Sequence, residues 1–83
     1  MKISQFHVKN QYILKDENGN TFFQSYDSII ARIDRIGNTV LDARYWDYSK
    51  TTGKYRNLFL GETKKETERK ISKGIYKLEN LNQ

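Results

Sequence analysis

Apolar and polar residues alternate along the first half of the chain, as they do in half-buried strands. The alternation runs through residues 6–8 and 12–15, and it resumes in residues 21–26 after Asn18-Gly19. Asn-Gly is a strong hairpin signal because both residues tolerate a positive φ angle. The pattern therefore predicts a hairpin with its turn at residues 16–20.

A second pair of strands is predicted on either side of Gly37-Asn38. In residues 28–34 the alternation places Ile29, Ala31 and Ile33 on one face and Ile30 on the other. A short helix over residues 27–33, capped by Asp27-Ser28, stays open as an alternative.

The strand after this turn is predicted to run from Thr39 to Trp46. Its core face would carry Leu41, Ala43 and Tyr45, which leaves Trp46 beside Arg44 on the less apolar face. This strand leads directly into the part of the chain with the most aromatic and cationic side chains.

After Tyr48 the apolar period lengthens to that of a helix. Tyr55, Leu58 and Phe59 stand at helical spacing and predict one buried stripe. Candidate N-caps and a glycine at the end bound this helix: Ser49, Thr51, Thr52 and Gly61.

A second helix is marked by Thr63-Lys64-Lys65-Glu66, which matches the capping box, and by Gly74 as its stop. Residues 75–81 are then predicted to form a short closing strand. The whole pattern indicates an α+β fold: a small antiparallel sheet of four to five strands with one or two short helices in the C-terminal half.

Length and composition favour one domain. The 83 residues divide into a strand-rich part (1–48), a helical part (49–74) and the closing strand, with no linker between them. The chain has no cysteine and no apolar run of the length of a membrane span, so we expect a cytoplasmic protein without a membrane partner. The absence of proline leaves edge strands unguarded, and a homodimer through an edge strand stays open.

The sequence offers little chemistry for catalysis. His7 is the sole histidine and stands in no motif, and Thr52-Gly53-Lys54 lacks the remainder of a phosphate loop. We therefore expect no catalytic residue, no metal site and no cofactor, and we expect the protein not to be an enzyme.

The net charge of +5 is distributed unevenly. Residues 1–43 carry five cations and five acids, whereas residues 44–77 carry ten cations and four acids. A neutral half joined to a basic half favours an acidic partner that meets the second half. The alternative is that these cations only keep the surface solvated.

Aromatic rings, hydroxyls and cations gather between the last long strand and the first helix. Rings interleaved with cations suit single-stranded nucleic acid, and a helix N-terminus suits an anion. The residues predicted to bind nucleic acid or another partner are Arg44, Trp46, Tyr48, Ser49, Lys50, Thr51, Thr52, Lys54 and Arg56. The alternative is that the rings belong to the core and the hydroxyls cap the helix.

The chain also resembles a group of small, uncharacterised proteins of bacteriophages and prophages over about residues 23–78. The resemblance is carried by four motifs: Phe23-Gln24-Ser25-Tyr26, Tyr48-Ser49-x-Thr51-Thr52-x-Lys54, Phe59-Leu60-Gly61, and Lys70-Ile71 with Gly74 and Tyr76. It implies a phage-encoded accessory protein and no particular activity.

Three functions follow from these expectations. The leading one is a non-enzymatic accessory protein that engages nucleic acid or an acidic host complex that handles nucleic acid. The alternatives are a protein–protein inhibitor of host defence, of the anti-CRISPR kind, and a structural or assembly protein of the phage particle.

Overall fold

A computed structural model describes residues 1–83 as an α+β fold with six strands and two helices. The predicted fold class and the placing of both helices in the C-terminal half are confirmed. The elements in chain order are β1 (Lys2–Phe6), β2 (Val8–Lys15), β3 (Thr21–Ser25), β4 (Ser28–Ile33), β5 (Thr39–Asp42), α1 (Lys50–Leu60), α2 (Lys64–Ser72) and β6 (Lys77–Glu79).

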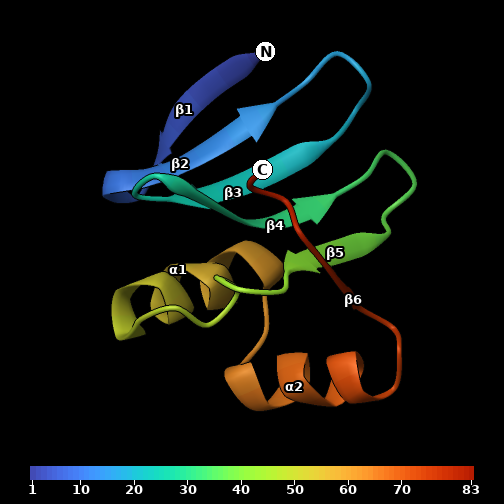
Figure 1. Cartoon of the computed structure of the whole chain (residues 1–83). Coiled ribbons are helices and arrows are strands. Elements are labelled where there is room, and N and C mark those ends of the chain that lie inside the picture. Colours follow the sequence, from blue (N-terminus) through green and yellow to red (C-terminus); the bar gives the residue numbers. More distant parts are fainter.

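The sheet follows the order of the chain, β1-β2-β3-β4-β5-β6 (Figure 1). Neighbouring strands are antiparallel from β1 to β5, but β6 pairs with β5 in parallel. A parallel neighbour requires a crossover connection, and α1 and α2 provide it between β5 and β6. The prediction of a purely antiparallel sheet of four to five strands is therefore corrected to a mixed sheet of six strands.

The undercount of strands arises at His7. This residue has a φ angle of 66° and turns the chain so sharply that Phe6 pairs with Val8. Residues 6–8, which the alternation joined into one strand, thus belong to the end of β1 and the start of β2.

The predicted hairpin between β2 and β3 is confirmed. Gly19 adopts a φ angle of 87° in its turn. The Asp16 carboxylate accepts hydrogen bonds from the backbone N–H groups of Asn18 and Asn20, both at 2.9 Å. The pKa of Asp16 is lowered, and the largest cause is the hydrogen bond that its Oδ2 atom accepts from the Asn20 side chain, followed by the backbone bonds.

Residues 28–33 form strand β4, so the alternative of a helix there is wrong. The strand contains a bulge: Phe23 pairs with Ala31, but the next residue, Gln24, pairs with Ile29. Ile30 is the extra residue, and it is as fully buried as Ala31. The predicted opposite placing of Ile30 and Ala31 is therefore wrong, because a strict alternation does not allow for a bulge.

Strand β5 ends at Asp42, four residues before the predicted end at Trp46. The Asp42 carboxylate accepts hydrogen bonds from the backbone N–H groups of Arg44 (3.0 Å) and Tyr45 (2.7 Å). These bonds take the place of further backbone pairing with β4 and turn the chain away from the sheet. Arg44 and Trp46 consequently lie in a turn and not on a strand face.

The helices cover the sheet through two small clusters. Phe23 and Ile30 pack with Tyr55 of α1, and Ala31 and Leu41 pack with Tyr76, which precedes β6. Phe59 of α1 packs against both clusters. Figure 1 shows α1 beside the strands and α2 farther from them. Leu58, predicted to share the buried stripe, is instead 50% exposed.

The predicted helix ends are confirmed. Ser49 caps α1 by accepting the Thr52 N–H, and Gly61 ends it with a left-handed φ angle of 69°. Thr63 and Glu66 form the capping box of α2. The closing strand is shorter than predicted, since only residues 77–79 of the range 75–81 join the sheet.

Gly53 lies inside α1, where glycine destabilises a helix. A Cβ atom added there would lie 3.6 Å from Arg56 Nη2 and 3.7 Å from Asp47 Oδ1, which is ordinary van der Waals contact. We expect Gly53→Ala to raise the free energy of unfolding by about 0.5–1 kcal/mol in urea titrations. Gly61→Ala is the control, because its left-handed backbone should make the same change destabilising. A loss of stability in Gly53→Ala would contradict this expectation.

Candidate functional site

The predicted binding residues all lie between the end of β5 and the middle of α1, but they differ in exposure. Trp46 is half-buried, and Thr52 and Arg56 are buried with 1% and 0% of their surface exposed. The exposed members are Arg44, Tyr48, Ser49, Lys50, Thr51 and Lys54.

Arg56 is a structural residue. Its Nη1 atom donates to the carbonyl oxygen of Trp46 at 2.8 Å and to Asp47 Oδ1 at 3.1 Å, and its Nη2 atom donates to Asn57 Oδ1 at 2.9 Å. The guanidinium carbon also lies 5.1 Å from the centre of the Trp46 ring. Arg56 therefore fixes the turn after β5 onto α1, and the prediction that it binds a partner is corrected by its burial.

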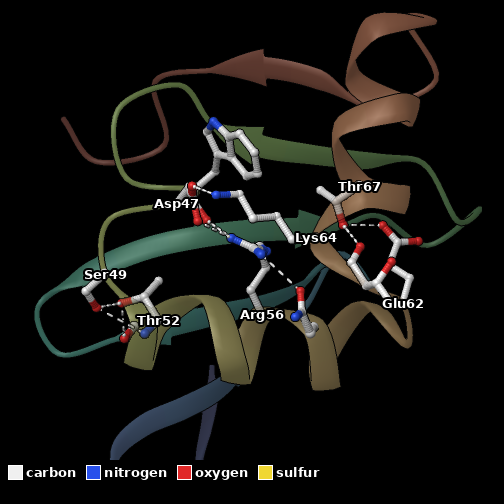
Figure 2. A network of polar contacts seen from close by, with 11 residues as sticks. Asp47, Ser49, Thr52, Arg56, Glu62, Lys64 and Thr67 are labelled. Carbon is white, nitrogen blue, oxygen red and sulfur yellow. Dashed lines mark hydrogen bonds and ion pairs between the residues drawn. The ribbon is translucent and has the colours of Figure 1, made fainter.

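Asp47 is the carboxylate that joins the two helices (Figure 2). Lys64, at the start of α2, reaches its Oδ2 atom at 2.7 Å while Arg56 holds Oδ1. Burial would raise the pKa of Asp47, but the hydrogen bonds and charges of Lys64 and Arg56 outweigh it and lower that pKa. Asp47 is therefore a partly exposed anion whose charge is compensated by two cations of the same chain.

Trp46 packs against the cluster of Ala31, Leu41 and Tyr76. The prediction that its ring lies free on the less apolar face is therefore only partly met: the ring is half-buried, with Arg56 above it. The turn formed by Asp42 causes the difference, because it removes Trp46 from the strand alternation.

Ser49 and Thr52 serve the start of α1. Besides accepting the Thr52 N–H, Ser49 donates its hydroxyl to Thr52 Oγ1 at 3.2 Å (Figure 2). Thr52 Oγ1 lies 2.9 Å from Ser25 Oγ of strand β3, a buried hydrogen bond between helix and sheet. For Ser49 and Thr52 the structure therefore fits the alternative interpretation, in which the hydroxyls serve the helix and not a partner. Thr51 stays exposed.

A shallow basic depression, here called the α1 groove, lies between α1, the turn after β5 and the start of α2. It measures about 630 Å³, and its accessible cations are Lys50, Lys54 and Lys64. Leu58 is its one apolar side chain. Lys64 is already paired with Asp47, whereas Lys50 and Lys54 form no ion pair.

Two tyrosine rings stand beside the N-terminus of α1. Tyr48 is 68% exposed, and its ring centre lies 5.5 Å from that of Tyr45. The guanidinium carbon of Arg44 lies 5.4 Å from the centre of the Tyr45 ring. Arg44, Tyr45 and Tyr48 thus form a ring-and-cation platform next to Lys50. Arg44 and Tyr48 are exposed members of the predicted site, whereas Tyr45, which was predicted to face the core, is half-buried and packs against the first cluster.

A second polar network, around Glu62, was not predicted. Its Oε1 atom accepts from Lys70 Nζ at 2.6 Å and from the Tyr76 hydroxyl at 2.9 Å, and its Oε2 atom accepts from the Thr67 hydroxyl at 2.6 Å. Burial would raise the pKa of Glu62, but these hydrogen bonds outweigh it and lower that pKa. The network fastens α2 to the segment before β6, and no sequence signal joined residues so far apart.

No group of three or more histidine, aspartate or glutamate side chains comes together that would hold a metal ion. Neither helix has the length and apolar character that crossing a bilayer demands.

The chain matches the family of unknown function DUF8033 over residues 1–76. It belongs to DUF8033. No curated protein and no solved structure matches the chain. The match covers β1 to α2 and ends before β6, so this DUF8033 member contains the candidate site within the matched region.

The motifs that carry the phage resemblance lie largely in the folding framework of this DUF8033 chain. Ser25 and Thr52 form the bond between helix and sheet, Gly61 ends α1, and Lys70 and Tyr76 bind Glu62. Tyr26, Tyr48 and Lys54 are the aromatic and cationic members of these motifs that stay exposed.

Proposed function

We propose that this protein is a non-enzymatic accessory protein of the phage type whose basic helical half binds nucleic acid. The observation that carries the proposal is the platform of Arg44, Tyr45 and Tyr48 beside Lys50 and Lys54 of the α1 groove. None of these three cations has a carboxylate within ion-pair distance.

The balance of paired and unpaired charges supports a polyanionic partner. Of the ten cations in residues 44–77, three are in ion pairs (Arg56, Lys64 and Lys70), which leaves seven unpaired. Of the four acids in residues 44–77, Asp47 and Glu62 are the partners in these ion pairs, and Glu66 accepts a hydrogen bond from Thr63. Few acids therefore remain to balance the unpaired cations on the surface of the helical half, and the resulting positive potential attracts phosphates.

The rings favour a single strand over a duplex. Bases of a single strand stack on exposed aromatic rings, while its phosphates are neutralised by nearby cations. Tyr48 offers an exposed ring, and Lys50 and Lys54 continue the cationic surface along α1. A duplex hides its bases and would leave the tyrosines without a role.

The test is fluorescence anisotropy of a labelled single-stranded oligonucleotide with Lys50→Gln/Lys54→Gln. We expect the affinity to fall about tenfold at about 50 mM salt, and the slope of log K against log salt to decrease by about 1.4, since each phosphate contact contributes about 0.7 for single strands. The matched control is Lys9→Gln/Lys15→Gln, which removes two exposed cations from the neutral half. Equal losses in both variants would contradict the proposed surface.

A pull-down from host lysate, repeated after nuclease treatment, separates this function from the others. Loss of the captured material after nuclease supports nucleic-acid binding. A protein complex that survives nuclease, together with no oligonucleotide retained by micromolar protein at low salt, would replace the proposal with inhibition of a host protein.

A further inference from the structure

A second recess lies where strand β5 leaves the sheet. On the side of β5, the backbone of Ile29 in β4 has no strand partner beyond Asp42, and the side chain of Asn82 takes that place. Its Oδ1 atom accepts the Ile29 N–H at 2.6 Å, and its Nδ2 atom donates to the Ile29 carbonyl oxygen at 2.8 Å. The C-terminal segment, the turn between β3 and β4, and the turn after β5 line a half-open recess of about 410 Å³, here called the end recess.

Some polar groups of the end recess are already hydrogen-bonded within the chain, here called committed, and others have no partner. Asp42 is committed, because its Oδ1 atom accepts the Leu81 N–H at 2.8 Å and its Oδ2 atom accepts the two N–H groups of the turn. Asn82 is committed to Ile29. The side chains of Asp27, Ser28 and Arg44 line the recess without any hydrogen bond or ion pair.

An acid and a cation that face one cavity without pairing suit a ligand with hydrogen-bond donors at one end and an anion at the other. The volume lies near the lower limit of small-molecule sites, about 300–1,000 Å³, which suits one nucleoside. Tyr45 contributes a half-buried ring to the wall. The contact between the Tyr45 and Tyr48 rings connects the recess with the surface at the start of α1.

We propose that the end recess takes one unstacked base of a bound single strand and prefers guanine, an inference that rests on the proposed function. The base would lie between the Tyr45 side chain and Asp27, and Arg44 would bind its phosphate. The two oxygens of the Asp27 carboxylate would accept hydrogen bonds from N1–H and N2–H of guanine, two parallel donors as in a bidentate pair. Uracil presents only one such donor, and adenine presents none at N1.

The test compares labelled oligouridylate of about eight nucleotides with the same strand carrying one central guanine, in ribose and deoxyribose form. We expect the guanine to tighten binding at least about fivefold, the lower end for a bidentate base contact. In Asp27→Asn this preference should vanish, because the amide turns one acceptor into a donor, while the affinity for the all-uracil strand should stay unchanged. Glu17→Gln, an exposed acid in the distant β2–β3 turn, should keep the preference.

Guanosine 5′-monophosphate alone separates this inference from the function of the α1 groove. We expect it to shift the amide NMR signals of Ser28, Arg44 and Asn82 in the wild-type protein, and not in Asp27→Asn. These shifts would support the recess even if no oligonucleotide binds, which would overturn only the proposed function. If oligonucleotides bind, an equal affinity for strands with and without guanine, or a preference for guanine that survives Asp27→Asn, would overturn the inference. So would the absence of shifts in the presence of the mononucleotide.

Discussion

Arg56→Ala is expected to lower the free energy of unfolding by about 1.5–3 kcal/mol, the range for hydrogen bonds that involve a charged group, because only the Arg56 end of its pair with Asp47 is buried. The side chain is 1% exposed and binds Asp47 and the Trp46 carbonyl oxygen. Without the guanidinium, that carbonyl group loses its partner and Asp47 keeps only Lys64. Urea unfolding followed by the fluorescence of the sole tryptophan, Trp46, measures the loss where it occurs.

Two variants define the cause of this loss. Arg56→Lys should recover only part of the stability, because an ammonium group cannot bind two acceptors in the fixed geometry of a guanidinium group. Lys54→Ala removes an exposed cation of the same helix and should change the stability by less than about 0.5 kcal/mol. An Arg56→Ala loss below about 1 kcal/mol would show that the turn after β5 is held by other contacts.

Asp42→Ala is expected to destabilise the protein by about 3 kcal/mol or more. The carboxylate is 1% exposed and accepts three backbone N–H groups, from Arg44, Tyr45 and Leu81. Each hydrogen bond to a charged group contributes about 1.5–3 kcal/mol, although the three are not additive. Thermal or urea unfolding at neutral pH measures the difference.

The pH dependence of this difference provides the check on its cause. Burial would raise the pKa of Asp42, but the N–H groups of Leu81 and Tyr45 outweigh it and hold that pKa below its ordinary value of 3.8. The carboxylate therefore contributes its full stability above pH 3.8, and the contribution is lost as the pH falls through the lowered pKa. The difference in the free energy of unfolding between the wild type and Asp42→Ala should therefore become smaller in that acidic range. A difference that does not change with pH would mean that lost packing, and not the carboxylate charge, causes the destabilisation. Glu68→Ala, at an exposed position of α2, serves as the control.

The local features of the fold were predictable from the sequence because short motifs determine them. Asn18-Gly19, the cap at Ser49, the capping box of Thr63 and Glu66, and the glycine after α1 act over a few residues each. The bulge at Ile30 and the end of β5 were not predictable, because hydrophobic periodicity assumes an unbroken ladder. The parallel pairing of β6 depends on how two helices cross over the sheet, which no local pattern contains.

The candidate site was predictable as a segment but not residue by residue. Composition identified the stretch after β5, and the exposed members Tyr48, Lys50 and Lys54 remain in it. Composition could not distinguish Arg56, whose carboxylate partner lies nine residues away, from a surface cation. It also gave no sign of Asp27 or Asn82, because the C-terminal segment brings them together only in the folded chain.

The succession of strands in chain order has a kinetic consequence. Strands β1 to β5 each pair with the next one along the chain, so their loops are short and closing them loses little entropy. Strand β6 and Asn82 reach back across both helices, with 53 residues separating Asn82 from Ile29. The meander is thus suited to nucleate folding, and the C-terminal segment to join last and to detach first. Amide hydrogens of the central strands would then exchange with solvent most slowly, and the end recess would be the first part to open.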